Sequence, residues 1–303
     1  MTASVEAQVG RCTMAAMAMP PATASSPAAP ALPSTPLEDL SPIPTAPGVY
    51  FFHGEGRLPL YIGKSINLRA RVQQHLRAPE EAQMMAQTRR VSWQRTAGEV
   101  GALLLESHLI KTQQPLFNVR LRRSKQLCAW HLPSPLQAPA LVNSRQFNFA
   151  ATPGLYGLFA SAHAAKQALR SRAEELGLCQ VRLGLEQDLG RGCFARQLGR
   201  CQGACTGQES PEAHHQRLLT ALLEWEVRHW PFDGAVGLVE RDGDWVQTHV
   251  LDQWCYLGTI EGPPKRRAPT KLPSPAFDMD SYRILMRPLL MGEHELVRWP
   301  KGA

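Results

Sequence analysis

The sequence predicts a mixed α+β protein: a small α/β unit, then a helical cysteine-rich region, then a short β-containing segment. Three observations support this prediction. Strand-like runs at 48–52 and 60–63 precede two helical patterns. Several cysteines gather between residues 179 and 205. Near the end, two alternating apolar runs flank Asp242–Gly243, a dipeptide typical of β-hairpins. We therefore expect a small central β-sheet flanked by helices in the first unit.

Length and composition set the outer limits. The chain has 303 residues, is 44% apolar and carries a formal net charge of +7. This length suits one large domain or two to three small ones, and the basic balance favours a polyanionic partner. No apolar run approaches the roughly 18 residues of a membrane span, so we expect no membrane contact. The expected divisions are a tail at 1–45, the α/β unit at 46–127, the cysteine-rich region at 128–229 and the small segment at 230–303.

The first 45 residues are dominated by Ala, Pro, Ser and Thr. Such a tract buries too little apolar surface to offset its ordering entropy, so we expect it to be disordered. A signal peptide is the competing interpretation, but MAAMAM is short and runs into Pro20–Pro21. We therefore expect a cytoplasmic protein. In a reducing compartment its cysteines are metal ligands or core thiols rather than disulfides.

The stretch GVYFFHGEGRLPLYIGK at 48–64 predicts a β-hairpin carrying Tyr50 and Tyr61. A single strand tyrosine ordinarily packs its ring and leaves its hydroxyl in water. The next segment, SINLRARVQQHLRA at 65–78, predicts an amphipathic helix with Ser65 as its N-cap. Arg71 and His75 lie four residues apart and project from one face of that helix. A solvated surface is their ordinary role, but the helix follows YIGK closely enough to bring Arg71 near Tyr61.

A third segment, GEVGALLLESHLIKTQQPLFNV at 98–119, predicts a helix that ends before Pro115. Helical phase puts Glu106 on the apolar stripe with Leu103 and Ile110. A buried carboxylate is costly, so such a glutamate pairs with a cation, binds a metal or turns at the edge of the stripe. Asn118 follows the helix and returns toward the sheet.

Together, GVY at 48–50, YIG at 61–63, Arg71, Glu106 and Asn118 reproduce the GIY-YIG nuclease pattern. The flanking sequence resembles the amino-terminal domain of the bacterial repair protein UvrC over about residues 46–127. The resemblance implies a divalent-metal-dependent endonuclease that hydrolyses phosphodiester bonds. It also implies that Glu106 binds Mg²⁺ or Mn²⁺ and that Tyr61 is the general base. Arg71 would then clamp the scissile phosphate, as transition-state charge requires.

Further residues join this expected site. Tyr50 would orient water or phosphate, and Asn118 would hold the site together. A free phenol has a pKa near 10, so Tyr61 needs a nearby cation, and Lys64 is the candidate. His75 stands where UvrC-type domains commonly have tyrosine. It either donates to phosphate or shuttles a proton, or it is a neutral residue on the helix surface.

Basic residues greatly outnumber acidic ones between positions 61 and 125. This charge coincides with the expected nuclease unit and supports a double-stranded DNA substrate. RLRRSK at 120–125 is the densest cluster, although basic runs are often only solvated tails. The candidate DNA contacts are Arg69, Arg120, Arg122, Arg123 and Lys125.

The cysteine-rich region offers a second site. Only Cys201 and Cys205 have the short spacing usual in zinc sites, whereas four thiolates also suit a 4Fe–4S cluster. The segment CFARQLGRCQGAC resembles the cysteine-rich region of UvrC proteins, and this resemblance implies an iron–sulfur cluster. Zinc and a metal-free thiol core are the alternatives. The expected ligands are Cys179, Cys193, Cys201 and Cys205.

The chain is too short for the second nuclease domain, the UvrB-binding hairpin and the terminal DNA-binding motifs of UvrC. The architecture resembles the Cho group, the short homologues of UvrC. This implies a monomer that makes the 3′ incision at a lesion on UvrB-bound DNA, downstream of UvrA, in nucleotide excision repair and the SOS response. Two alternatives remain at this stage. One is a non-enzymatic DNA-binding or recruiting module, and the other a structure-specific nuclease outside excision repair.

Overall fold

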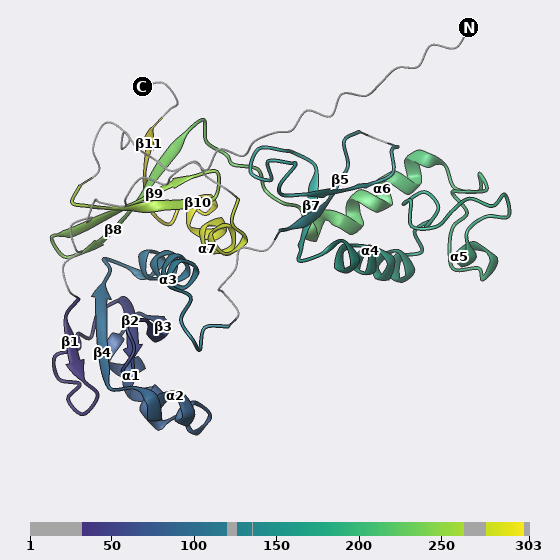
Figure 1. Cartoon of the computed structure of the whole chain (residues 1–303). Coiled ribbons are helices and arrows are strands. Elements are labelled where there is room, and N and C mark those ends of the chain that lie inside the picture. The colour runs from purple at the N-terminus through teal and green to yellow at the C-terminus, as the bar shows by residue number, and fades with distance from the viewer. Residues whose placement is uncertain (1–31, 120–125, 135, 264–276, 300–303) are drawn as a thin grey trace, which may run out of the picture. The chain divides into compact units, whose positions relative to one another are not determined.

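The computed structural model describes residues 32–119, 126–134, 136–263 and 277–299 (Figure 1). Across this part of the chain it contains three antiparallel β-sheets accompanied by helices, which confirms the predicted α+β class. No helix among the described residues is long and apolar enough to cross a membrane.

The first sheet has the strand order β1-β4-β2-β3. Its strands are β1 (Ser34–Pro36), β2 (Gly48–His53), β3 (Pro59–Ser65) and β4 (Arg90–Arg95). The predicted hairpin is present, because β2 pairs with β3. β2 is buried over its whole length, since α1 (Leu68–Arg77) and α2 (Ala82–Gln87) pack on one face and α3 (Glu99–Gln113) on the other.

The first helix begins two residues later than the sequence predicts. Its N-cap is Asn67, whose Oδ1 accepts a hydrogen bond of 3.0 Å from the Ala70 amide. Ser65 is instead the last residue of β3, and its hydroxyl oxygen accepts from the Asn67 amide in the turn. The prediction of Ser65 as N-cap was wrong because the strand continues through it. The third helix ends as expected, with Gln114 in the left-handed conformation just before Pro115.

Residues 33–45 were expected to be disordered, and the structure contradicts this. Thr35 pairs with Val91 at the edge of the first sheet, and Ile43 is completely buried. Arg69 holds the segment by donating to the carbonyl oxygens of Ile43 and Ser41, both at 2.7 Å. Composition misled here because an edge strand tolerates proline, and the remaining contacts come from distant residues. Residues 1–31 of the expected tail lie outside the described residues.

The middle region begins with a sheet that the sequence did not reveal. Its strands are β5 (Cys128–His131), β6 (Ala140–Asn143) and β7 (Leu155–Phe159), in the order β6-β5-β7. These strands are too short for a clear alternating pattern. The expected helices follow as α4 (Ala162–Leu176), α5 (Phe194–Gln197) and α6 (Pro211–Leu222), and Trp130 of β5 packs between the sheet and α4.

The last sheet has the order β10-β9-β8-β11. The predicted hairpin is confirmed as β8 (Ala235–Asp242) and β9 (Trp245–Asp252), with Gly243 at a φ of 60° in the turn. β10 (Cys255–Glu261) and β11 (Glu295–Trp299) complete the sheet, and α7 (Met279–Leu290) confirms the expected terminal helix. Most of the expected linker at 261–275 lies outside the described residues.

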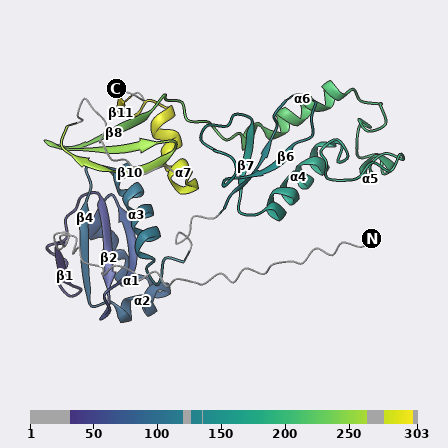
Figure 2. The ribbon, with the colours of Figure 1, turned by 45° about the horizontal axis from the view of Figure 1, so that its top comes forward.

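Helix α3 belongs to two structural layers. Ile110 packs under β2 and β3 of the first sheet. Val100 and Leu104 instead join the core of the last sheet, with Leu238 and Trp254. Figures 1 and 2 show α3 between these two sheets, with α7 beside it. The helix that carries Glu106 is therefore packed on both sides.

Candidate active site

Glycines allow the two strands of the hairpin to bring their tyrosines together. The register places Tyr50 opposite Gly63 and Phe52 opposite Tyr61, so these side chains share one face of the sheet. A Cβ on Gly63 would lie 2.2 Å from the hydroxyl oxygen of Tyr50. A Cβ on Gly48 would lie 2.4 Å from the Gln94 carbonyl oxygen on β4. Only glycine fits at either position, which explains the glycine in each half of the GVY and YIG motifs.

Tyr50 is buried and hydrogen bonded to a histidine on α1. Its hydroxyl lies 2.5 Å from Nε2 of His75, and Nδ1 of His75 contacts a carboxylate oxygen of Glu81. An ionised carboxylate only accepts, so Nδ1 carries the hydrogen and Nε2 accepts from the phenol. Burial lowers the pKa of His75, although Glu81 opposes this, and burial raises the pKa of Tyr50 well above its usual value. The neutral imidazole and neutral phenol are therefore the favoured forms.

His75 is only 2% exposed, so the alternative of a surface histidine was wrong. Glu81, in the turn after α1, was missed by the sequence analysis. The sequence does not predict this contact. A Pro-Glu-Glu turn is ordinarily solvent-exposed, and nothing in it indicates a bond to a histidine six residues earlier.

Tyr61 lies beside this pair. Its ring centroid is 5.5 Å from that of His75 and 6.1 Å from that of Tyr50. Burial raises the pKa of Tyr61, and the negative charge of Glu106 raises it further, whereas the charge of Arg71 lowers it. Arg71 lies on the exposed side of α1, where it donates to Gln74. The predicted proximity of Arg71 to Tyr61 is thus present, and its charge also lowers the pKa of Tyr50.

Glu106 completes the group from α3. Its Oε1 accepts from the Lys64 amide at 2.8 Å. Within the described parts of the chain, Oε2 has no hydrogen-bond partner. Burial raises the pKa of Glu106, while the Lys64 amide and the charges of Lys64 and Arg71 oppose the rise. A half-buried carboxylate with one oxygen available suits a hard divalent cation that keeps several water ligands.

Lys64 forms an ion pair through its side chain, whereas the Asn118 side chain is hydrogen bonded to the backbone of β3. The ammonium of Lys64 pairs with Glu99 at 2.6 Å. Asn118 accepts from the Ile62 amide and donates to the Ile62 carbonyl oxygen, both at 2.8 Å. Because β3 is an edge strand, this amide pairs backbone groups of the YIG motif that would otherwise lack a partner strand.

The expected DNA-contacting residues have mixed outcomes. The guanidinium of Arg69 is bound to the backbone of Ser41 and Ile43, so its contacts are structural ones that the sequence did not predict. The other four candidates fall in a segment outside the described residues: Arg120, Arg122, Arg123 and Lys125.

The cysteine cluster forms in the loops between α4 and α6. The sulfur atoms of Cys179, Cys193 and Cys201 lie within 4.8 Å of one another. Cys205 joins them, because its sulfur accepts from the Cys193 amide at 3.3 Å, and the Cys201 sulfur accepts from the Gly203 amide at 3.4 Å. Amide-to-sulfur hydrogen bonds of this kind support thiolate ligands of a metal centre. His214 is a near neighbour that orients the loop by accepting from the Cys179 amide.

Comparison with known protein families agrees with this geometry. Residues 46–119 match the UvrC-like GIY-YIG domain, and residues 127–224 match the middle domain of UvrC and Cho excinucleases. Residues 235–303 match the C-terminal domain of excinuclease Cho.

Individual relatives and one solved structure are similar to this chain over different lengths. The chain is 50% identical over 260 residues to "Excinuclease cho" of Escherichia coli K12, covering 85% of this chain and 87% of that protein. It is 32% identical over 191 residues to the UvrABC system protein C of Deinococcus radiodurans, covering 62% and 30%. A solved structure of the magnesium-bound endonuclease domain of Thermotoga maritima UvrC is 30% identical, with a TM-score of 0.25, covering 27% of this chain and 93% of that one.

Proposed function

The chain belongs to the excinuclease Cho family of UvrC-like nucleases, and we propose that it makes the 3′ incision beside a lesion in UvrB-bound DNA. Endonuclease activity in excision repair follows from the family and leaves no need for a non-enzymatic module. The side of the incision and the requirement for UvrB are proposals that go beyond what the family establishes. The observation that carries the nuclease site is that Glu106 of α3 and Arg71 of α1 both lie close to Tyr61 of β3.

We infer that Glu106 holds Mg²⁺ or Mn²⁺ through its available Oε2. When bound, the cation would stabilise the charge that builds on phosphate oxygens. Oε1 is already fixed by the Lys64 amide, so the carboxylate is held in one orientation. Neutralising Glu106 would also remove the negative charge that raises the pKa of Tyr61.

In the proposed mechanism, Tyr61 first loses its own proton to solvent, and the resulting phenolate takes the proton from the attacking water. Arg71 lies near both phenols and would bind the scissile phosphate, where its positive charge favours the phenolate of Tyr61. Lys64 contributes through its backbone amide on Glu106, and Asn118 keeps β3 in place through Ile62. These roles require no rearrangement of the strands.

Tyr50, His75 and Glu81 support Tyr61 in this proposal. His75 accepts from Tyr50 and donates to Glu81, so the Tyr50 hydroxyl has a fixed orientation. A fixed Tyr50 oxygen beside Tyr61 is suited to orienting the attacking water. His75 thus acts on the site through Tyr50 rather than by touching phosphate.

One nuclease centre supports one cut. In the described residues we find a single GIY-YIG site and no second carboxylate group of nuclease type. The chain would therefore make one of the two incisions, and another enzyme the other. We propose that UvrB presents the damaged DNA, because a UvrABC system protein is among the relatives.

For the cysteine cluster we propose a 4Fe–4S centre held by Cys179, Cys193, Cys201 and Cys205. Their convergence and the amide hydrogen bonds to two of the sulfurs support it. Zinc would suit the same sulfurs, so the metal itself must be measured. The cluster lies in the middle region, and its proposed role is structural.

A nicking assay on a duplex with one site-specific lesion tests the proposed function. The two strands are labelled at different ends, and the protein is added with and without UvrA and UvrB. The proposal expects one nick on the 3′ side that needs Mg²⁺ or Mn²⁺ and UvrB. A nick on the 5′ side, or an unchanged rate without UvrB, would refute the corresponding part.

A further inference from the structure

Helix α3 begins without a cap of its own. Its N-cap is Gly98, in extended backbone, and among the described residues of the nuclease unit no side chain accepts a hydrogen bond at this end. The first amides of any helix lack partners within the helix and need acceptors from elsewhere. For α3 this matters more than usual, because Glu106 lies on the same helix.

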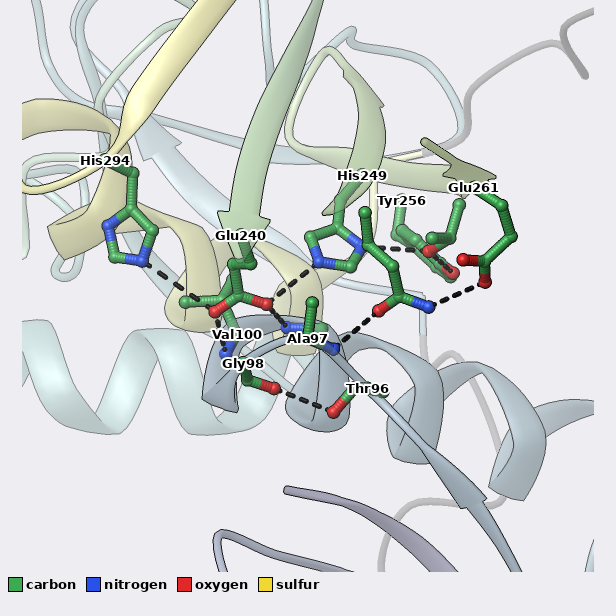
Figure 3. Close-up of polar contacts among 12 residues, drawn as sticks. Thr96, Ala97, Gly98, Val100, Glu240, His249, Tyr256, Glu261 and His294 are labelled. Carbon is green, nitrogen blue, oxygen red and sulfur yellow. Dashed lines mark hydrogen bonds and ion pairs between the residues drawn. The ribbon is translucent and has the colours of Figure 1, made fainter. Parts of the chain in front are cut away.

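Glu240 of β8 supplies the missing acceptors. Its Oε1 accepts from the Val100 amide at 2.9 Å, and its Oε2 accepts from the Gly101 amide at 2.7 Å (Figure 3). The side chain is 8% exposed, so water does not compete for these bonds. A carboxylate at a helix N-terminus also interacts favourably with the helix dipole. The last sheet thus caps a helix of the nuclease unit.

Two glycines admit this carboxylate. A Cβ on Gly98 would lie 2.2 Å from Glu240 Oε1, and a Cβ on Gly101 would lie 2.5 Å from the His249 ring. Neither glycine has a φ in the left-handed region, so close approach rather than backbone conformation explains both. The two glycines at the start of α3 therefore leave the space that the side chains of Glu240 and His249 occupy.

Neighbouring strands hold Glu240 in its ionised form. His249 of β9 lies with Nε2 2.9 Å from Oε2 and donates to it, while its Nδ1 contacts the Thr259 hydroxyl at 2.8 Å. His294 lies 3.9 Å from Oε1 (Figure 3). Burial raises the pKa of Glu240, but the hydrogen bonds from His249, Gly101 and Val100 lower it more, so it ends below its usual value.

The C-terminal segment also holds the other end of α3. Lys111 pairs with Asp278 at 2.7 Å and with Asp280 at 2.8 Å, both at the start of α7. Its side chain is 16% exposed, so these pairs are more than surface contacts. Glu106 lies between the Glu240 contact and the Lys111 contact, and both ends of its helix are fixed by residues 235–299.

We propose that Glu240 is a positioning residue of the nuclease site, which sets the affinity of Glu106 for its divalent cation by fixing α3 against the C-terminal sheet. This inference rests on the proposed role of Glu106. Loss of a residue that is hydrogen bonded directly to a metal ligand typically changes metal affinity by about 10–100-fold. Glu240 acts on Glu106 through helix α3, so the expected effect lies at the low end of that range. The C-terminal segment would then be a structural part of the active site.

Full-length Glu240→Gln tests the proposal. Glutamine keeps the size but offers one acceptor oxygen, so one amide of α3 loses its partner. We expect Mn²⁺ binding, measured by electron paramagnetic resonance, to weaken about 10-fold. Nicking should need correspondingly more Mg²⁺ and regain its maximal rate at saturation. In the protein without metal, hydrogen exchange at the Val100 and Gly101 amides should accelerate.

Matched variants separate the outcomes. Arg241 follows Glu240 on β8 and forms an exposed pair with Glu295 of β11; Arg241→Gln removes this pair and should leave Mn²⁺ binding unchanged. Gly101→Ala disturbs the contact without changing charge and should weaken Mn²⁺ binding as Glu240→Gln does. A folded Glu240→Gln protein with wild-type Mn²⁺ affinity would overturn the proposal. Wild-type Mn²⁺ affinity in Glu106→Gln would instead show that the assignment of the cation ligand is at fault.

Discussion

The hydroxyl of Tyr50 and Nε2 of His75 lie 2.5 Å apart, joining the first strand of the hairpin to the helix that follows it. Behind His75, Glu81 receives the hydrogen of Nδ1. The sequence left open whether His75 belongs to the site or to the helix surface. His75 is in fact one of the most buried groups near the tyrosines. Its proposed role is to fix the Tyr50 hydroxyl, which makes nicking depend on the protonation of His75.

Burial lowers the pKa of His75 below its usual 6.5, so His75 is neutral at pH 7 and accepts from Tyr50. Protonation at lower pH fills Nε2 and breaks that bond. The nicking rate should therefore hold down to pH 6.5 and fall only below it. His75→Ala should reduce the rate at pH 7.5 and change this acidic limb. Steady-state nicking from pH 5 to 8 measures both.

The exposed His163 on α4 provides the control, because His163→Ala should leave the pH profile unchanged. An acidic limb that is identical in wild type and His75→Ala would refute the role of His75.

Gly63→Ala should abolish the hairpin geometry at the site, because the new Cβ would meet the Tyr50 hydroxyl at 2.2 Å. Tyr50 is buried and cannot move without disturbing Phe52 and His75. We expect a loss of about 1–3 kcal/mol in unfolding free energy, as for overpacked cores, together with loss of nicking. Gly56→Ala, in the loop of the same hairpin, meets nothing within 4 Å and should match wild type. Chemical denaturation and nicking of both variants decide the matter.

Asn118→Asp should detach the segment after α3 from the edge of β3. The carboxylate has no N–H to donate to the Ile62 carbonyl oxygen and would repel it. We expect about 1–3 kcal/mol of destabilisation by thermal unfolding, with reduced nicking. Asn67→Asp makes the same chemical change at the N-cap of α1, where only the side-chain oxygen is used, and should be neutral. Equal stability of the two variants would contradict the account of Asn118.

The cysteine cluster predicts a metal content and a colour. Protein purified without oxygen should contain iron and acid-labile sulfide and absorb visible light. Cys201→Ser should lose most of this absorbance and become more sensitive to protease in the middle region. Cys128→Ala, in β5 outside the cluster, should keep the absorbance. A colourless wild-type protein that contains one zinc ion would replace the iron–sulfur proposal with a zinc site.

The sequence predicted the parts of the fold that local patterns control. The hairpin at 48–65, helix α3 with its end before Pro115, and the Asp242–Gly243 turn depend on residues adjacent in the chain. It did not predict the strand at 34–36 or the short sheet at 128–159, because long-range pairing stabilises these strands. Amphipathic phase correctly placed Glu106 on a packed face of its helix.

The contacts that the sequence did not predict likewise join residues that are not adjacent in the chain. Glu81 reaches His75 across a turn, and Glu240 reaches the start of α3 from another sheet. Neither residue has a sequence spacing that predicts its contact. Arg69 was expected to contact DNA only because it is basic, whereas its guanidinium binds backbone carbonyl groups. Charge counts indicate a surface of the right sign but do not separate a structural arginine from a DNA-binding one.

The central claim is that Glu106 holds the divalent cation at which DNA is cut. Glu106→Gln keeps the side-chain size and the acceptor for the Lys64 amide but removes the charge. The decisive measurement is nicking of a UvrB-bound lesion duplex by this variant over a Mg²⁺ titration, beside Glu55→Gln, which changes an exposed glutamate of the hairpin loop. We predict a rate at least about 10³-fold lower for Glu106→Gln, with DNA binding retained. Nicking by Glu106→Gln at the wild-type rate and Mg²⁺ midpoint would contradict the account.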